Sequence, residues 1–365
     1  MARAIDRHRR GLDRDTLYFP ESDPEEEACK AAAAYLGGGP LENIALTDST
    51  TMGLGLLYAG LRLKRGDEVL TTEHDFYATH EALRLRAVRD GIVVRKVRLY
   101  DDSATASGPE MVSRLRAAVT DRTRVVAVTW VHSGTGVRLP ISEIAGALAE
   151  RSRGRDEADR ILLCVDAVHG MGAESSTPVE LGCDFFVSGT HKWLFGPRGT
   201  GVIWGRSEAW PHVDPTIPSF SHEAMSAWRN GHPPQGPAAV LATPGGFHSF
   251  ENRWALAEAF AFHRAIGPAR IAARTREQAS RLKDGLSRLR HVRLHTPRSA
   301  ELSSGLVCCS VDGTHPGEVA ARLHEDHRIV ASVTPYREPY LRFGPSIVTR
   351  PEEVDALVRA MASLR

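Results

Sequence analysis

The sequence has no uninterrupted run of 18 or more apolar residues, and this absence excludes a conventional transmembrane helix. It also has no excess of one charge, because 46 Lys and Arg side chains oppose 45 Asp and Glu side chains, for a net charge of +1. Binding to nucleic acid or to a membrane surface through a basic face needs a surplus of positive charge, so we expect neither partner. The basic N-terminal stretch 1–23 has no apolar core and does not read as a signal peptide.

Cysteine and lysine are both scarce. The five cysteines show no C-x-x-C spacing, which argues against a zinc site or a disulfide framework; they are Cys29, Cys164, Cys183, Cys308 and Cys309. We therefore expect buried, reduced thiols and a cytoplasmic protein. Only five of the 46 basic residues are lysines. A lysine kept among apolar neighbours in such a chain indicates amine chemistry that arginine cannot perform.

The composition is that of a globular protein, with 42% hydrophobic and 25% charged residues in a chain of 365. From about residue 40 to 205, short apolar runs alternate with amphipathic stretches, a pattern typical of an α/β fold whose mainly parallel sheet is covered by helices. We predict strands over 43–46, 68–71, 92–97, 125–130, 161–165, 185–188 and 201–204. We predict crossover helices over 52–61, 78–90, 109–119 and 141–152.

The last third of the chain has a different pattern. Residues 211–244 contain seven prolines and no clear periodicity, and such a segment typically carries a site or an interface. A helical pattern over 251–289 leads into a smaller α+β unit. Its elements are expected at 305–311 (strand), 315–326 (helix), 329–333 (strand) and from 351 on (helix). We therefore predict a large domain over 1–250, and a long connecting helix with a small domain over 251–365.

The most informative residue is Lys192, which lies in a small polar turn after a predicted strand, between His191 and Trp193. A lysine that is partly removed from water loses its proton readily and can attack a carbonyl to form a Schiff base. The alternative is a surface lysine at the end of a strand.

Asp166 ends the buried strand that precedes this turn, where a lone carboxylate is costly unless it is paired. A protonated pyridine nitrogen is a suitable partner, and pyridoxal phosphate uses such an aspartate to hold its ring as an electron sink. His169, three residues later, lies within reach of the face or the phenolic oxygen of that cofactor. Asp166 could equally serve as the N-cap of the next helix.

The residues Ser49, Thr50 and Thr51 form a hydroxyl-rich turn between a predicted strand and a helix. Backbone N–H groups and the helix dipole at such a turn bind phosphate, and the hydroxyls add donors. The same residues also serve as ordinary helix caps. The turn is neither a P-loop nor a G-x-G-x-x-G fingerprint.

Together these three motifs resemble the fold-type-I pyridoxal-phosphate enzymes, and among them the class V aminotransferase family. The resemblance runs from about residue 20 to the C-terminus, and the segments VDAVHG and SGTHKWLFGPRGTG carry most of it. Within the family, the motifs are similar to the branch of isopenicillin N epimerase and cysteine-conjugate lyases. The resemblance implies a large domain with a mainly parallel seven-stranded sheet, a smaller C-terminal α+β domain, and pyridoxal 5'-phosphate as cofactor.

It also implies catalytic roles for individual residues. Lys192 would form the Schiff base, Asp166 would pair with the pyridine nitrogen, and His169 would lie near the phenolic oxygen. His74 matches the catalytic residue that stacks on the pyridine ring, although Phe76 or Tyr77 could do the stacking, and His74 could be an ordinary helix cap.

Further residues match the cofactor and substrate contacts of the family. Thr50, Thr51, Ser188 and Thr190 correspond to phosphate contacts, and Thr243 corresponds to a threonine that reaches the phosphate of the neighbouring subunit in a homodimer. Ser133 stands where many relatives carry an asparagine near the phenolic oxygen. Arg342 matches the arginine that holds the substrate carboxylate, a task that suits its bidentate geometry.

The resemblance makes an amino acid the expected substrate and removal of its α-proton the first chemical step. Cysteine desulfurases need a nucleophilic cysteine in the loop before Arg342, and residues 329–339 contain none, so we do not expect a desulfurase. The His/Pro-rich stretch 228–237 suggests that a bulky side chain is accommodated. We therefore rank β-elimination of an S-substituted cysteine, in secondary metabolism, first. Epimerisation and transamination are the alternatives.

Overall fold

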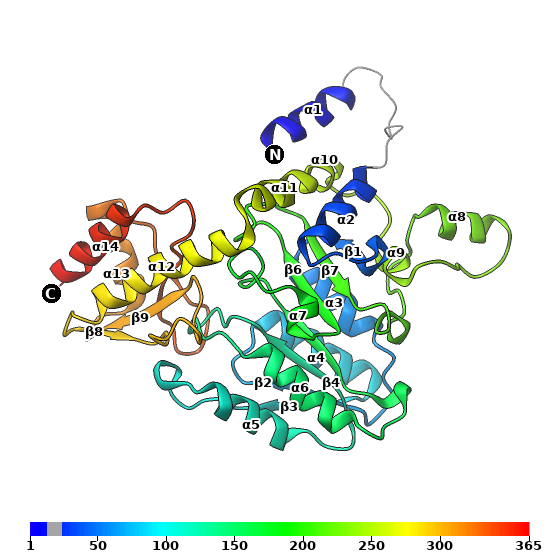
Figure 1. Ribbon diagram of the computed structural model, residues 1–365, viewed down its shortest axis with the longest axis horizontal. Coiled ribbons are helices and arrows are strands. Elements are labelled where there is room, and N and C mark those ends of the chain that lie inside the picture. Colours follow the sequence, from blue (N-terminus) through cyan, green and yellow to red (C-terminus); the bar gives the residue numbers. More distant parts are fainter. Residues whose placement is uncertain (13–23, 365) are drawn as a thin grey trace.

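The computed structural model describes residues 1–12 and 24–364, which form two sheets with helices packed around them (Figure 1). The larger sheet has seven strands in the order β1-β7-β6-β5-β4-β2-β3. Their bounds are β1 Ile44–Thr47, β2 Glu68–Thr72, β3 Val93–Val97, β4 Thr123–Thr129, β5 Leu162–Asp166, β6 Phe185–Gly189 and β7 Gly201–Gly205. Strands β2 to β6 pair in parallel, and β7 runs antiparallel to both β1 and β6.

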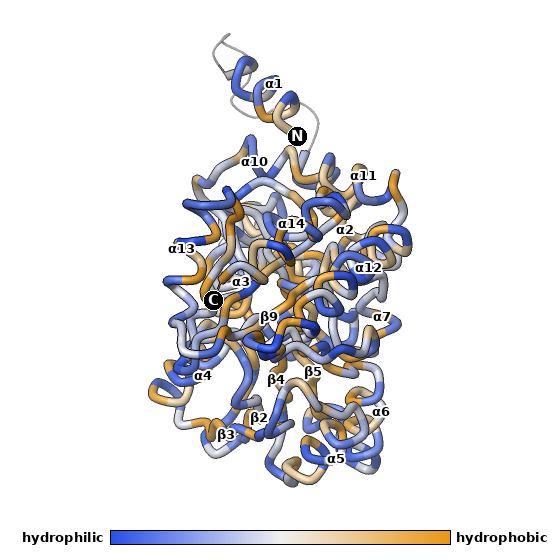
Figure 2. Tube along the Cα trace, turned by 90° about the vertical axis from the view of Figure 1, so that its left-hand side faces the viewer, coloured by the Kyte–Doolittle hydropathy of each residue, from blue (hydrophilic) through white to orange (hydrophobic). Residues whose placement is uncertain are grey.

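The central strands are apolar because both faces of the sheet are covered. Alternate side chains of β5 enter different cores: Leu163 and Val165 join one cluster, and Leu162 and Cys164 join the other. Fully buried parallel strands of this kind have continuous hydrophobic sequences. Figure 2 shows these apolar stretches in orange through β4 and β5 in the interior.

Helices cover the two faces of the large sheet. One core includes residues of α2 (Pro24–Tyr35), α5 (Gly108–Ala118), α6 (Ile141–Ser152) and α11 (Leu256–Ile266), and the other includes residues of α3 (Thr50–Gly60) and α4 (Tyr77–Asp90). Shorter helices are α7 (Pro178–Leu181), α9 (Ala238–Ala242) and α10 (Phe250–Trp254), and α1 (Ala2–Leu12) lies near α10. Four 3-10 helices cover Leu41–Asn43, Ser103–Thr105, Glu157–Asp159 and Trp210–His212.

The smaller sheet is antiparallel, in the order β10-β11-β9-β8. Its strands are β8 Val292–Leu294, β9 Val307–Val311, β10 Ser332–Val333 and β11 Leu341–Phe343, and its helices are α13 (Pro316–His327) and α14 (Pro351–Ser363). The 19-residue helix α12 (Pro268–Leu286) packs on α14 and leads into this unit from the large sheet (Figure 1). A third hydrophobic core lies between this sheet and helices α12, α13 and α14.

The α/β fold class and the seven-stranded, mainly parallel sheet are confirmed. Each of the seven predicted strands of the large sheet is present within a few residues of its expected bounds. The strand predicted over 329–333 was too long, because its ladder with β11 pairs only Ser332 and Val333. The short strands β8 and β11 were not predicted, because three residues carry too little periodicity. The division of the chain into domains at residues 250 and 251 stays a prediction.

The proline-rich segment contains a helix that the sequence analysis did not predict. Helix α8 (His222–Arg229) begins at Ser221, whose Oγ atom accepts a hydrogen bond from the N–H of Ala224 at 3.2 Å. It projects away from the large sheet (Figure 1), and Trp228 on it is 72% exposed. An amphipathic stretch of eight residues is too short to be distinguished from a loop by sequence periodicity alone.

None of the described helices is both long enough and apolar enough to cross a bilayer. None of the five cysteines takes part in a disulfide, and four of them are buried. Among residues 1–12 and 24–364, no group of three or more His, Cys, Asp and Glu side chains is arranged to hold a metal ion.

Candidate active site

The candidate site lies where several parallel strands of the large sheet end. Asp75 follows β2, Ser133 follows β4, Asp166 ends β5 and Lys192 follows β6. Ligands of open α/β sheets bind outside the carboxyl ends of the strands, because the loops that follow the strands meet there. The topology therefore brings together residues as far apart in the sequence as Asp75 and Lys192.

Lys192 is partly buried, and its Nζ atom lies 3.1 Å from Nε2 of His169. Burial lowers the pKa of the Lys192 amine; the carboxylate of Asp166 opposes this shift, and the guanidinium of Arg342 adds to it. A lowered pKa increases the fraction of lysine that is an unprotonated nucleophile. The environment therefore favours the amine chemistry predicted for Lys192.

The turn after Lys192 has an unusual backbone. Phe195 adopts a left-handed conformation with φ of 55°, which costs a non-glycine residue about 1–2 kcal/mol. At Gly196, a Cβ atom would lie 2.5 Å from the Thr190 hydroxyl oxygen. The turn thus folds back tightly on the segment before the lysine and holds it in place.

Asp166 is buried, and its Oδ1 atom accepts a hydrogen bond from the N–H of Val168 at 3.0 Å. Burial raises the pKa of this carboxyl group to about 6, although the Val168 hydrogen bond and the charge of Lys192 lower it. A buried carboxylate that has few partners of its own is suited to pair with a cationic group of a ligand.

His169 lies between Lys192 and Trp193. Its Nδ1 atom accepts a hydrogen bond from the Trp193 indole N–H at 3.1 Å, while its Nε2 atom faces Lys192. Burial and the positive charges of Lys192, Arg342 and His191 hold the His169 pKa well below its ordinary value. The ring is therefore neutral at physiological pH.

His74 is neutral as well, because burial lowers its pKa to about 3. Its Nε2 atom accepts a hydrogen bond from the N–H of Leu99 at 3.2 Å. One face of its ring stacks on Tyr100, with ring centroids 3.8 Å apart and planes inclined by 11°. The Tyr100 hydroxyl in turn contacts Nδ1 of His132 at 2.8 Å, so an internal network holds the His74 ring.

The hydroxyl-rich turn begins helix α3. Ser49 caps the helix by accepting a hydrogen bond from the N–H of Met52 at 3.1 Å, and Thr51 is exposed. The Thr50 hydroxyl oxygen accepts a hydrogen bond from the N–H of Gly189 at 2.7 Å. This contact joins the turn to the end of β6, three residues before Lys192.

The hydroxyls of Ser188 and Thr190 point into the protein. Both side chains are fully buried; Ser188 donates to the carbonyl oxygen of Gly189 at 2.9 Å, and Thr190 contacts the hydroxyl of Thr200. These contacts brace the turn that carries Lys192.

Arg342 on β11 reaches the site from the smaller sheet. Its Nη1 atom donates to the carbonyl oxygen of Ser133 at 3.0 Å, and its Nε atom donates to the Ser332 hydroxyl at 3.1 Å. The Nη2 atom has no hydrogen bond to any part of the chain that the structure describes. The guanidinium is thus oriented by the protein and keeps donors for a carboxylate.

Thr243 lies at the edge strand β1 of its own chain. Its hydroxyl accepts a hydrogen bond from the N–H of Leu46 at 3.1 Å and donates to the carbonyl oxygen of Ala239 at 3.1 Å. The segment that follows helix α9 is thereby held against the large sheet.

Two residues of this region were missed by the sequence analysis. The Asp75 carboxylate accepts hydrogen bonds from the Thr71 hydroxyl and from the N–H groups of Thr72 and Thr129, each at 2.7 Å. It thereby joins the ends of β2 and β4. Its place directly after a predicted strand, beside His74, was the available signal.

Tyr336 is the second of these residues, and its hydroxyl lies 2.6 Å from the Ser133 hydroxyl. Its ring covers Gly134, where a Cβ atom would lie 2.9 Å from the tyrosine ring. It comes from the loop between β10 and β11, and no local sequence pattern indicates that this loop folds over Ser133.

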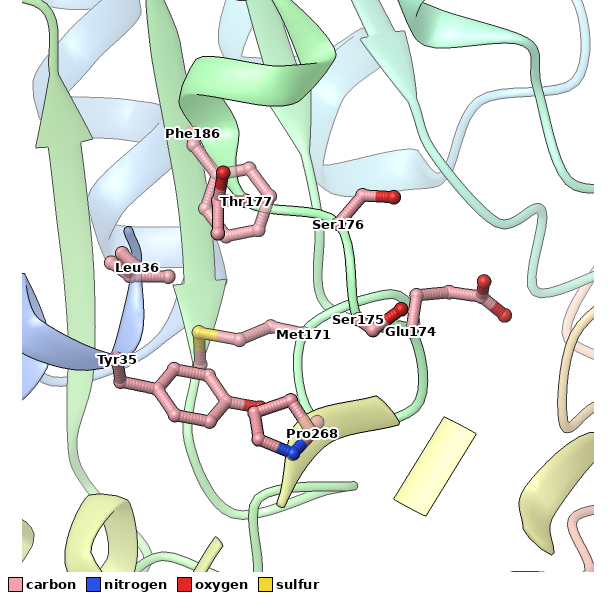
Figure 3. A pocket seen from close by; sticks show the side chains of 10 residues that line it. Tyr35, Leu36, Met171, Glu174, Ser175, Ser176, Thr177, Phe186 and Pro268 are labelled. Carbon is pink, nitrogen blue, oxygen red and sulfur yellow. The ribbon is translucent and has the colours of Figure 1, made fainter. Parts of the chain in front are cut away.

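A narrow cavity lies beside the turn that follows His169 (Figure 3). It is lined by residues that include Tyr35, Met171, Phe186 and Pro268, and none of its lining residues was predicted as a site residue. Its walls combine apolar side chains with the polar side chains of Glu174, Ser175, Ser176 and Thr177, and no member of the Lys192 cluster lines it.

The chain is similar to known proteins of one family. The family model described as aminotransferase class-V matches residues 22–333. The isopenicillin N epimerase of Streptomyces clavuligerus is 30% identical over 93% of this chain and 84% of its own length. A probable cysteine desulfurase of Mycolicibacterium paratuberculosis is 25% identical over 93% of this chain, which spans 49% of that relative.

Among solved structures, a complex of the cystine C–S lyase C-DES with its product cysteine persulfide superposes with a TM-score of 0.86. The match covers 99% of this chain and 93% of that chain at 21% identity, so it shows a common fold. Because the family model spans most of the sequence and the fold agrees, the chain belongs to the class V aminotransferase family of fold-type-I enzymes, whose cofactor is pyridoxal 5'-phosphate.

Proposed function

We propose that this enzyme holds pyridoxal phosphate on Lys192 and removes the α-proton of an amino acid, with β-elimination of an S-substituted cysteine as its reaction. The observation that carries the proposal is the amine of Lys192, whose pKa is lowered by burial, beside the buried Asp166 and within 3.1 Å of His169. A single amine with a lowered pKa is the base that an elimination at the β-carbon requires.

The chemistry of the side chains fits the cofactor. Asp166 offers a buried carboxylate for a protonated pyridine nitrogen, and the neutral, planar ring of His74 suits stacking on a pyridine. The N-terminus of the 11-residue helix α3 offers N–H groups and a positive dipole end to a phosphate. We assign the phosphate contacts to Thr50 and Thr51.

Ser188 and Thr190 receive a different role in this proposal. Their buried hydroxyls contact groups of their own turn, so they support the backbone around Lys192. The phosphate is then bound by the helix terminus and by Thr50, whose oxygen accepts from Gly189 and whose hydrogen remains available to donate.

The substrate is held by its carboxylate. The oriented guanidinium of Arg342 binds it in bidentate fashion, and Lys192 then removes the α-proton. When bound, pyridoxal phosphate accepts the electron pair that is left on the α-carbon. The C–S bond then breaks as a double bond forms between the α- and β-carbons, and the sulfur leaves as a thiolate that takes up a proton. Water hydrolyses the released aminoacrylate to pyruvate and ammonia. We extend the proposal to secondary metabolism because the His/Pro-rich stretch 228–237 in the sequence favours a bulky substituent.

A cysteine desulfurase is not our proposal, although relatives of the chain include proteins named as such. Desulfurases need a reactive thiolate at the substrate. Cys308 and Cys309 lie on β9, where burial raises the pKa of each thiol to about 12, and the loop between β10 and β11 contains no cysteine. Thiols of this kind are poor nucleophiles at neutral pH.

Epimerisation of an amino acid is the second candidate, and the 30% identity to isopenicillin N epimerase favours it. It shares the first step with elimination, since Lys192 removes the same proton. The two reactions differ in whether the α-carbon is reprotonated before a β-substituent leaves.

We also propose that the enzyme is a cytoplasmic homodimer whose partner covers the segment around helix α8. Phe220 and Trp228 in this segment are 64% and 72% exposed, so they offer apolar surface that a partner subunit could cover. The proposal includes a contact of Thr243 with the phosphate in the neighbouring subunit. Sedimentation of the holoenzyme tests it, and a monomer that keeps full activity on dilution contradicts it.

A panel of L-amino acids and S-substituted cysteines tests the reaction. We expect pyruvate and a free thiol from S-substituted cysteines, together with exchange of the α-proton in deuterium oxide. Racemisation without pyruvate would support the epimerase, and alanine with a persulfide would contradict the exclusion of desulfurase activity. Absence of α-proton exchange with all substrates would overturn the proposal.

A further inference from the structure

Three side chains from two turns form a continuous contact chain beside the candidate site. The Trp193 indole N–H donates to Nδ1 of His169 at 3.1 Å, and Nε2 of the same ring lies 3.1 Å from Nζ of Lys192. Trp193 follows Lys192 directly in the sequence, yet its side chain acts on His169 rather than on the lysine.

The contact with Trp193 determines where the proton of His169 resides. An indole nitrogen can only donate a hydrogen bond, so Nδ1 must provide a lone pair. Burial, with the positive charges of Lys192, Arg342 and His191 around the ring, keeps the His169 pKa well below its ordinary value. A neutral imidazole carries one N–H, and in this ring it must be on Nε2.

We propose that Trp193 is a positioning residue: its indole N–H holds His169 as the Nε2–H tautomer, so that His169 presents a hydrogen-bond donor to Lys192 and to the phenolic oxygen of the cofactor. The part that concerns the cofactor rests on the proposed function. The part that concerns the tautomer rests on the contacts within the chain alone.

The orientation of this donor has a chemical consequence. An Nε2–H group cannot accept a hydrogen bond from an ammonium group, whereas it can donate to a free amine or to a phenolate oxygen. The free amine is the state in which the lysine nitrogen has lost its proton, so this donor favours that state of Lys192. Around Lys192, the Asp166 carboxylate opposes this state and the Arg342 guanidinium favours it, so the tautomer adds to the effect of Arg342.

The smaller domain holds the indole in place. Trp193 is 7% exposed, and its ring lies against Gly305 and Gly344, which flank β9 and β11. A Cβ atom at Gly305 would lie 2.5 Å from Cη2 of the indole, and one at Gly344 would lie 3.6 Å from the same atom. Glycine at position 305 therefore leaves the space that the indole occupies.

The test compares the wild-type holoenzyme with Trp193→Phe, which keeps an aromatic ring and removes the N–H. Loss of the donor to the phenolic oxygen makes the nitrogen that joins Lys192 to the cofactor more basic. We expect the pH at which the visible absorption band of the holoenzyme changes to rise by about 0.5 to 1 unit. Trp210→Phe is the matched control, because this buried indole also donates one hydrogen bond, to the carbonyl oxygen of Asn43 at 3.3 Å, in the other core.

A second readout follows the tautomer itself. With ¹⁵N-labelled histidine, and with His169→Asn to assign the signal, we expect a protonated Nε2 in wild type and a population of Nδ1–H in Trp193→Phe. If both the absorption band and the His169 signal are unchanged in Trp193→Phe, the inference is overturned. If wild type binds no cofactor on Lys192, the proposed function fails, while the ¹⁵N signal of the protein still decides the role of Trp193.

Gly305→Ala provides an independent variant in case Trp193→Phe does not fold. It keeps the indole N–H but forces the ring to move, because the added methyl group would overlap with it. We expect the absorption band to shift in the same direction as in Trp193→Phe. A displaced indole with an unchanged band and an unchanged His169 signal would overturn the inference.

Discussion

The hydroxyl of Tyr336 lies 2.6 Å from the hydroxyl of Ser133, and this hydrogen bond joins two segments that are 203 residues apart. Ser133 also accepts a hydrogen bond from Arg342 through its carbonyl oxygen, at 3.0 Å. The smaller sheet therefore reaches the end of β4 through two residues that converge on Ser133. Burial raises the Tyr336 pKa to about 12, so its phenol stays protonated and serves as a hydrogen-bond donor or acid.

Tyr336→Phe keeps the ring on Gly134 and removes only the hydroxyl. We expect kcat/KM to fall by about 2- to 10-fold, the value of one hydrogen bond, with cofactor content unchanged. Ser133→Ala removes the other side of the same contact. Because the two groups act as a pair, the losses of the single variants should not add in the double variant. Full additivity would show that the contact does not contribute.

Lys192→Ala removes the amine that we predict to hold the cofactor. We expect turnover to be abolished, and borohydride reduction of the wild-type holoenzyme followed by peptide mapping should find the cofactor on Lys192. Lys64→Ala serves as the control, because Lys64 is not one of the predicted site residues and has no predicted catalytic group beside it. Recovery of the cofactor on Lys64 or Lys283 would refute the assignment of the motifs.

Arg342→Lys keeps the positive charge and loses the planar fork. We expect kcat/KM to fall by about 10- to 150-fold, corresponding to about 1.5–3 kcal/mol, while the cofactor stays bound. Arg337→Lys is the matched control, because Arg337 is exposed in the loop between β10 and β11, five residues before Arg342. A loss confined to Arg337→Lys would move the carboxylate contact to that residue, and no loss in either variant would argue against an α-amino acid substrate.

Asp166→Asn should stabilise the cofactor-free protein while it removes activity. The folded pKa of Asp166, about 6, lies above its ordinary value of 3.8, so the free energy of unfolding falls as the pH rises between these values. Above pH 6 the ionised carboxylate costs about 3 kcal/mol, and asparagine removes that cost. Urea unfolding at pH 4 and pH 8 measures the difference.

Asp75→Asn is the contrasting variant for the same measurement. The Asp75 carboxylate accepts three hydrogen bonds from the ends of β2 and β4, and we expect its replacement to destabilise the fold. If Asp166→Asn destabilised the protein as Asp75→Asn does, the cost assigned to the ionised Asp166 would be wrong.

His132→Asn tests how the stability of the protein depends on pH. Burial lowers the pKa of His132 from the ordinary value of 6.5 to about 3 in the folded protein. The neutral ring therefore has no effect on the free energy of unfolding above pH 6.5, and this free energy falls as the pH is lowered from 6.5 toward 3. Each such histidine lowers the free energy of unfolding by about 1.4 kcal/mol for every pH unit in this range. We expect a shallower slope in His132→Asn than in wild type, measured by urea unfolding between pH 5 and 8. An equal slope in His132→Asn and wild type would contradict this assignment.

The sequence by itself determined the strands of the large sheet and the order of the candidate motifs. Strands buried on both faces need continuous apolar side chains, so runs such as 125–130 and 161–165 are recognisable without any tertiary information. The same physics makes polar residues at the ends of these runs conspicuous. Asp166 and Lys192 were therefore identified as candidates from local sequence alone, and their roles stay predictions.

Only the tertiary structure decided which polar groups are available and which are already engaged. Thr50, Ser188 and Thr190 are alike in the sequence, yet the hydroxyl of Thr50 joins helix α3 to β6, while those of Ser188 and Thr190 are buried within their own turn. The contacts of Tyr336 with Ser133 and of Trp193 with His169 depend on where separate loops meet in space. Hydrogen bonds require partners within about 3 Å, and the distance between two loops is set by the packing of the sheets and helices that carry them, which no local sequence pattern encodes.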